Sequence, residues 1–132
     1  MPGLTIFYRM NSLVAIFIGG GIGSLARYGV SLLSKSMFKT EFPLGTLLAN
    51  VLSCVAMGLI LVLLKDKVGQ NDIVKAMLIT GFCGGFSTFS TFSFETVELL
   101  KSGNMSFAIA NIVLSIVLCL GILIILTKKQ II

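Results

Sequence analysis

The sequence predicts an all-α membrane protein with four transmembrane helices. Of its 132 residues, 56% are hydrophobic and only 11% are charged, whereas about a quarter of a soluble domain is charged. Its 15 charged side chains (10 Lys or Arg and 5 Asp or Glu) are too few to cover a 14.1 kDa globule, and the mean hydropathy is +1.06. Four apolar stretches each reach the ~20 helical residues needed to cross a bilayer core of ~30 Å.

Missing residue types exclude several classes of function. The chain has no His, which excludes a catalytic triad, an imidazole general base and a His-ligated metal site. The three cysteines are odd in number and lie far apart inside apolar runs, a pattern of neither a disulfide framework nor a zinc site. The net charge of +5 comes from cations placed singly or in pairs beside apolar segments. That placement indicates membrane-flanking charge and no nucleic-acid partner.

The predicted spans divide a single domain, 1–132, into four helices with charged linkers. They cover about 11–33, 43–64, 73–100 and 105–126. The turn residues predicted between them are Gly69, Asn71, Gly103 and Asn104. The first span lacks an A-x-A-like cleavage site and continues to Arg27, so we expect a retained helix and no cleaved signal peptide.

Positive charge gives a weak signal for orientation. The side that holds both ends carries six cations: Arg9, Lys65, Lys67, Lys75, Lys128 and Lys129. The other side carries three: Lys35, Lys39 and Lys101. The bias favours both termini in the cytoplasm, and its small size leaves insertion in both orientations open.

The first span carries a stripe of small and polar residues at helical spacing. The stripe comprises Gly20, Ser24, Arg27 and Ser31, and Gly19 and Gly23 form a GxxxG pair beside it. Close helix packing explains the glycines. Arg27 has no acidic neighbour on its helix, so we expect a structural or vestibule role rather than direct contact with an ion.

The second and fourth spans carry similar stripes. The second has Thr46, Asn50 and Ser53; the fourth has Asn104, Ala108, Asn111, Ser115 and Cys119. The amide of Asn50 offers two donors, and it either links helices or serves an ion path. Asn111 and Ser115 likewise require a partner or a water-filled path.

The third span contains an unusual run of glycines, hydroxyls and aromatic residues. The segment 81–95 reads GFCGGFSTFSTFSFE. Adjacent glycines and hydroxyl side chains weaken a helix, so we expect a break near Gly84–Thr88. Non-helical backbone at membrane depth is tolerated where it is buried in protein or lines a cavity. Phe89 and Phe92 share one face of the helix that follows.

Hydrogen-bond donors on three spans predict an anion path. No acidic residue lies in the middle of a span, and a cation path usually needs carboxylates or rings of carbonyls. Amide, hydroxyl and guanidinium donors, and the positive edge of an aromatic ring, suit an anion. Because four short helices leave little room for a pore within one chain, we expect the path to form between chains.

Three motifs resemble those of the fluoride channels called Fluc or CrcB. They are GGGIGSLARY at 19–28, GTLLAN at 45–50 and GFCGGFSTFSTF at 81–92. The resemblance covers essentially the whole chain, and the third motif is the most specific. It implies a fluoride-selective channel in the cell membrane, through which cytoplasmic fluoride leaves passively. Neutral hydrogen fluoride enters acidified cells and ionises inside, and the membrane potential then drives fluoride out.

The resemblance also implies an assembly and roles for named residues. Family members are antiparallel dimers with two fluoride pores at the subunit interface. The implied pore residues are Asn50, Phe89, Thr91, Phe92 and Ser115. Arg27 matches an arginine near the vestibule, and the backbone carbonyls of Gly84 and Ser87 match those that hold a structural Na⁺ at the dimer centre. The partner is a second copy in dual topology or a paralogous subunit.

The chain departs from the family pattern at three positions. Ser87 replaces the usual Thr, Ser53 replaces a usual Gly, and Asn111 stands where an aromatic residue is often found. Because the implied Na⁺ ligand is a carbonyl, the change at Ser87 should leave sodium binding intact. The change at Ser53 affects the packing of the second span, and the change at Asn111 alters the polar stripe of the fourth span.

Two further classes of membrane protein compete with a channel. A small four-span multidrug antiporter needs a membrane carboxylate, but the first span offers Arg27, and Glu95 and Glu98 lie near the end of the third. A non-transporting accessory subunit would not need donor stripes on three helices. An enzyme is disfavoured because the sequence shows no pair of nucleophile and base.

Overall fold

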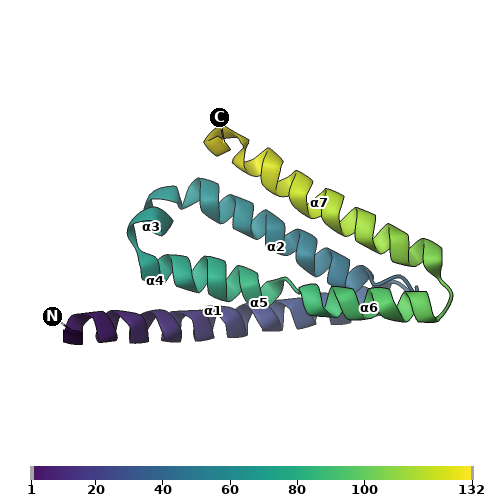
Figure 1. The fold of residues 1–132 in the computed structure, drawn as a ribbon, viewed down its shortest axis with the longest axis horizontal. Helices are drawn as coiled ribbons and strands as arrows, with labels where there is room; N and C mark the ends of the chain where they lie inside the picture. The colour runs from purple at the N-terminus through teal and green to yellow at the C-terminus, as the bar shows by residue number, and fades with distance from the viewer. Residues whose placement is uncertain (1, 132) are drawn as a thin grey trace.

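Four long helical spans form the fold, as the sequence predicts. The structure, a computed structural model, describes the backbone of residues 2–131 and the side chains of residues 6–128. The elements are α1 (Pro2–Met37), α2 (Leu44–Leu63), α3 (Lys65–Gln70), α4 (Asp72–Lys75), the π-helix η1 (Ala76–Cys83), α5 (Gly84–Phe86), α6 (Phe89–Lys101) and α7 (Met105–Ile131) (Figure 1). From α4 to α6 the chain forms one bent span.

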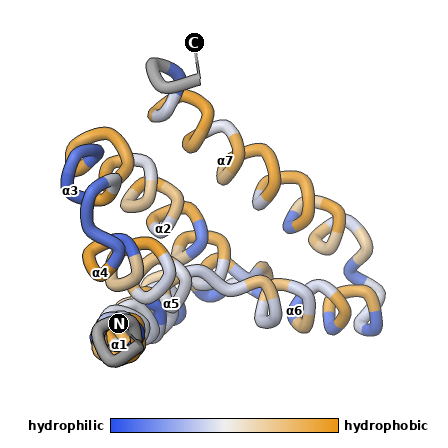
Figure 2. Tube along the Cα trace, turned by 60° about the vertical axis from the view of Figure 1, so that its left-hand side comes forward, coloured by the Kyte–Doolittle hydropathy of each residue, from blue (hydrophilic) through white to orange (hydrophobic). Residues whose placement is uncertain are grey.

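Length and hydropathy allow all four spans to cross a bilayer. The candidate segments are Ile6–Met37, Leu44–Leu63, Asp72–Lys101 and Met105–Lys128. Figure 2 shows apolar residues along α2 and α7 and polar residues gathered around α3. Large apolar side chains are exposed along the spans, with Phe17 of α1 81% exposed. This chain is therefore a multi-pass membrane protein.

The first helix is longer than predicted because nothing in the sequence interrupts it. It begins at Pro2 rather than near residue 11 and continues to Met37. No Gly or Pro occurs between Gly3 and Gly19, and these two residue types weaken helices most. The orientation of the chain stays a prediction, and the side chain of Lys129 lies outside the described residues.

The predicted turns are confirmed at Asn71 and Gly103. Asn71 caps α4, since its Oδ1 accepts from the backbone N–H groups of Ile73 at 3.0 Å and Val74 at 3.2 Å. Gly103 follows α6 with a φ of 82°, a left-handed conformation that glycine adopts freely. The prediction of a turn at Gly69 is wrong, because this residue lies in the last turn of α3, where a helix tolerates glycine.

Glycines bring α1 into backbone contact with the third span. A Cβ atom added to Gly19 would clash with the Met77 carbonyl, and one added to Gly23 would clash with the Phe82 carbonyl. On the facing element, a Cβ on Gly81 would lie 2.9 Å from the Ile16 carbonyl oxygen. The close packing predicted for the GxxxG pair is thus confirmed, and it positions the break in the third span against α1.

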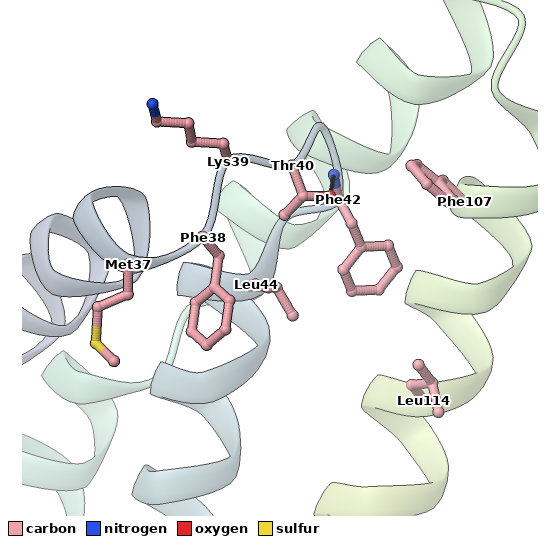
Figure 3. Close-up of a pocket in the computed structure, with 8 residues that line it drawn as sticks. All are labelled: Met37, Phe38, Lys39, Thr40, Phe42, Leu44, Phe107 and Leu114. Atoms are coloured by element: carbon pink, nitrogen blue, oxygen red, sulfur yellow. Dashed lines mark hydrogen bonds between the residues drawn. The ribbon is translucent and has the colours of Figure 1, made fainter.

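At one end of the bundle, the segment before α2 contacts the start of α7. Asn104 Nδ2 donates to Glu41 Oε2 at 2.8 Å, and the rings of Phe42 and Phe107 meet edge to face with centroids 5.7 Å apart. From this end α2 and α7 run in the same direction (Figure 1). An open hollow beside the same loop is lined mainly by apolar side chains, while Lys39 extends away from them (Figure 3). It includes none of the predicted pore residues.

Candidate functional site

The third span breaks at Ser87 and Thr88, inside the predicted region. Both residues have extended backbone, with ψ values of 157° and 118°. The π-helix η1 precedes the break, and such wider turns often occur at functional sites. Thr88 then caps α6, because its hydroxyl accepts from the Thr91 backbone N–H at 3.3 Å. The break therefore starts a new helix within the same span.

Asn50 of α2 holds the broken backbone through both ends of its amide. Its Oδ1 accepts from the Thr88 backbone N–H at 2.7 Å, and its Nδ2 donates to the Thr88 carbonyl at 3.2 Å. Thr88 is 7% exposed, so these groups would otherwise lack water as a partner. One N–H of the Asn50 amide is left over for another acceptor.

A pocket beside this clamp brings together four of the five predicted pore residues. The pocket measures about 370 Å³ and is lined by Asn50, Cys54, Ser87, Thr88, Phe89, Phe92, Ser115, Ile116, Cys119 and Leu120. None of these side chains is ionisable as an acid or base other than the two thiols. The pocket lies between α2, α6 and α7, at the level of the break.

Two neighbouring phenylalanine rings line this pocket. The ring centroids of Phe89 and Phe92 are 5.6 Å apart with planes inclined by 40°. Phe89 is 79% exposed in the single chain, whereas Phe92 is half-buried. Aromatic rings carry partial positive charge at their edges. The pocket is therefore lined by one strongly exposed ring and one half-buried ring.

The fourth span supplies polar groups that the chain leaves unpaired. Ser115 is 9% exposed, and its buried hydroxyl has no partner among the described residues. One turn earlier, the fully buried Asn111 donates through Nδ2 to Thr96 Oγ1 at 2.9 Å, while its Oδ1 has no described partner. Thr96 in turn donates to the Phe92 carbonyl at 2.7 Å. This chain of bonds ties α7 to the backbone of the phenylalanine pair.

Thr91 lies apart from the other predicted pore residues. It lines a larger hollow, about 680 Å³, which also includes Lys35, Glu95 and Glu98. Its hydroxyl accepts from that of Thr88 at 3.1 Å. Thr91 is thus connected to the pocket through Thr88 but does not line it.

The carbonyls of Gly84 and Ser87 lack their usual helical donors. The N–H of Thr88, four residues after Gly84, is bonded to Asn50. The N–H of Thr91, four residues after Ser87, is bonded to the Thr88 hydroxyl. Gly84 is exposed and Ser87 half-buried in the single chain. Neutral oxygens of this kind suit a hard cation such as Na⁺.

Arg27 lies on α1, outside the pocket, and is half-buried. Within the described residues it has no ion pair or side-chain hydrogen bond. The structure therefore places it apart from the pocket of the phenylalanines and Asn50, and its vestibule or structural role stays a prediction.

Sequence reasoning missed Thr96, which links Asn111 to Phe92. A threonine in a helix commonly bonds the carbonyl four residues earlier, and that spacing from Phe92 was available in the sequence. Ser53, which belongs to the polar stripe of the second span, is buried and donates to the Cys83 carbonyl at 2.9 Å. It adds a second contact from α2 to the segment before the break.

Comparisons with known proteins agree with the motifs. The family model described as CrcB-like protein, Camphor Resistance (CrcB) matches residues 14–127. A protein of Chloroflexus aurantiacus named fluoride-specific ion channel FluC is 44% identical over 108 residues, 82% of this chain and 86% of its own. A protein of the same name from Coxiella burnetii is 40% identical over 113 residues, 85% and 90% of the two chains. This coverage shows that the chain belongs to the CrcB family.

Proposed function

We propose that this chain is a fluoride-selective ion channel, through which cytoplasmic fluoride leaves the cell passively. The observation that carries the proposal is the pocket in which Asn50, Phe89, Phe92 and Ser115 come together. The names of the relatives support a fluoride channel and a non-enzymatic transporter. The protein would act in the cell membrane and lower intracellular fluoride.

The groups that line the pocket suit a small anion. Ser115 has an unpaired hydroxyl, and Asn50 has one N–H beyond the clamp. The edges of Phe89 and Phe92 add partial positive charge without a competing cation. Fluoride is strongly hydrated, so compact donors along the route replace its water. The lining has no carboxylate to repel an anion.

The pore is completed by a second subunit. Phe89 lines the pocket and is 79% exposed in the single chain, and a partner packed against it would enclose the ion and bury the ring. The weak charge bias of the sequence is compatible with two copies inserted in opposite orientations. An antiparallel homodimer is therefore our proposal, and a paralogous partner is the alternative.

Structural sodium fits the two free carbonyls. In an antiparallel dimer, Gly84 and Ser87 would each contribute one neutral oxygen from each subunit. The described residues contain no group of three or more His, Cys, Asp or Glu side chains that could hold a metal, so backbone oxygens are the available ligands. Bound Na⁺ would supply positive charge that holds the two breaks together.

Fluoride efflux from liposomes tests the proposed function. The purified chain is reconstituted with internal fluoride, and a fluoride electrode records efflux after the membrane potential is released with valinomycin. Rapid loss of fluoride but not chloride is expected. Phe89→Ile and Phe92→Ile should abolish this flux while the dimer elutes normally in size-exclusion chromatography. Unchanged flux in both variants would remove the phenylalanines from the ion path.

No efflux from the unmodified chain would point to a paralogous partner, and co-expression with one is then the deciding experiment. Failure of the co-expressed pair would refute channel function. Equal efflux of chloride would refute selectivity.

A further inference from the structure

Two cysteines face the proposed ion path from neighbouring helices. Cys54 on α2 and Cys119 on α7 both line the pocket that contains Asn50 and Ser115. Each is a free thiol and half-buried, and the two helices that carry them pack against each other. The proposed pore therefore contains a dithiol that the fluoride path does not use.

The register of the two parallel helices produces this pair. Cys54 lies four residues after Asn50, and Cys119 lies four residues after Ser115. Four residues advance a helix by about 6 Å. Because α2 and α7 pack together and run in the same direction, the thiols pair one turn beyond the amide and the hydroxyl.

We propose that Cys54 and Cys119 form a two-thiol binding site for a soft monovalent cation, Cu⁺ or Ag⁺, and that the bound ion blocks fluoride conduction. Soft sulfur ligands select soft metals, whereas carboxylates and carbonyls select hard ones. The lining holds neither a carboxylate nor a third thiol. Cu⁺ and Ag⁺ accept two sulfur ligands, which matches this donor set.

The binding step balances without an oxidant. One thiol loses its proton and binds as a thiolate, while the second binds through a sulfur lone pair. The metal ion enters with one positive charge and one proton leaves, so the complex is neutral. A neutral complex avoids the free-energy cost of an uncompensated charge within the membrane.

The third cysteine provides a matched control. Ser53, the residue before Cys54, donates to the Cys83 carbonyl at 2.9 Å, but the side chain of Cys83 is fully buried and does not line the pocket. It carries the same thiol chemistry within a membrane span but does not line the proposed path. Metal binding that depends on Cys54 and Cys119 but not on Cys83 would therefore identify the pair.

Block follows from the position of the site. A metal bridge would occupy part of a pocket of about 370 Å³ and join α2 to α7 one turn from Asn50 and Ser115. The ion path would then lose both free volume and the mobility of its walls. The block rests on the proposed function, whereas the metal site does not.

The test titrates the purified, detergent-solubilised full chain with silver nitrate in chloride-free buffer. Calorimetry should show a tight site for one Ag⁺ per chain, and X-ray absorption should show two sulfur neighbours. Cys54→Ser and Cys119→Ser should each weaken this site at least tenfold, while Cys83→Ser should leave it unchanged. In liposomes, Ag⁺ should reduce fluoride efflux at least tenfold in the unmodified chain and less than twofold in either pocket variant, each compared with its own silver-free rate.

Equal silver affinity in the unmodified chain and in both pocket variants would overturn the two-thiol site. Loss of silver binding in Cys83→Ser, with binding kept in both pocket variants, would overturn it too. Tight binding without any fall in efflux would overturn the block. If the chain conducts no fluoride without silver, the efflux test is run on the co-expressed pair, and failure of that pair refutes the proposed function and the block together. The titration and the absorption spectrum still decide the two-thiol site in that case.

Discussion

Replacing Asn50 with Ala removes the clamp on the broken backbone. The variant loses the 2.7 Å bond from the Thr88 N–H and the 3.2 Å bond to its carbonyl. A buried donor left without a partner costs about 1–3 kcal/mol, and an ordinary hydrogen bond contributes about 0.5–1.5 kcal/mol. We therefore expect Asn50→Ala to lower the free energy of unfolding by about 2–4 kcal/mol.

Unfolding of the detergent-solubilised protein, followed by circular dichroism against temperature and denaturant, measures this loss. Ser12→Ala is the control, because Ser12 is half-buried and only donates to the Tyr8 carbonyl of its own helix, in a solvent-exposed bond of 3.1 Å. It should change stability by less than about 0.5 kcal/mol. If Asn50→Ala were as stable as Ser12→Ala, the clamp would not hold the break, and the reasoning from the two bonds would be refuted.

Three other predictions concern packing, the polar chain and sodium. Gly23→Ala should lower the free energy of unfolding by about 1–3 kcal/mol, because the new methyl group meets the backbone of the third span. Gly21→Ala is the control: its methyl group meets nothing within 4 Å, and it should stabilise the helix by about 0.5–1 kcal/mol. Equal unfolding temperatures for the two variants would contradict the contact at Gly23. Thr96→Val should destabilise the fold by about 1–3 kcal/mol, because it leaves the buried Asn111 amide without its acceptor; denaturation at unchanged midpoint would contradict this. Replacing Na⁺ with N-methylglucamine should weaken dimerisation measured by light scattering, and an unchanged dimer fraction would remove sodium from the interface.

Much of the fold could be predicted from composition and spacing. Twenty-residue apolar stretches between charged linkers define the spans, and the run of glycines and hydroxyls located the break to within a few residues. The glycine contacts also followed from sequence, because a GxxxG pair has few other uses in a membrane helix.

The sequence could not show which partner each polar group selects. Asn50 was equally compatible with joining helices and with lining an ion path, and the structure has it do the first while lying in the pocket. Its bonds to Thr88 join residues 38 positions apart, so no local pattern encodes them. The same holds for Asn111 and Thr96, which meet only because α6 and α7 pack together.

The dual use of Asn50 restricts how the protein can change. A substitution there alters the chemistry of the pocket and the integrity of the backbone at once, so variation at position 50 cannot explore new ion preferences without a loss of stability. Ser115 makes no such bond with any residue that the structure describes. Laboratory selection for altered anion preference should therefore accumulate changes on α7 before α2, with the amide of Asn50 retained throughout.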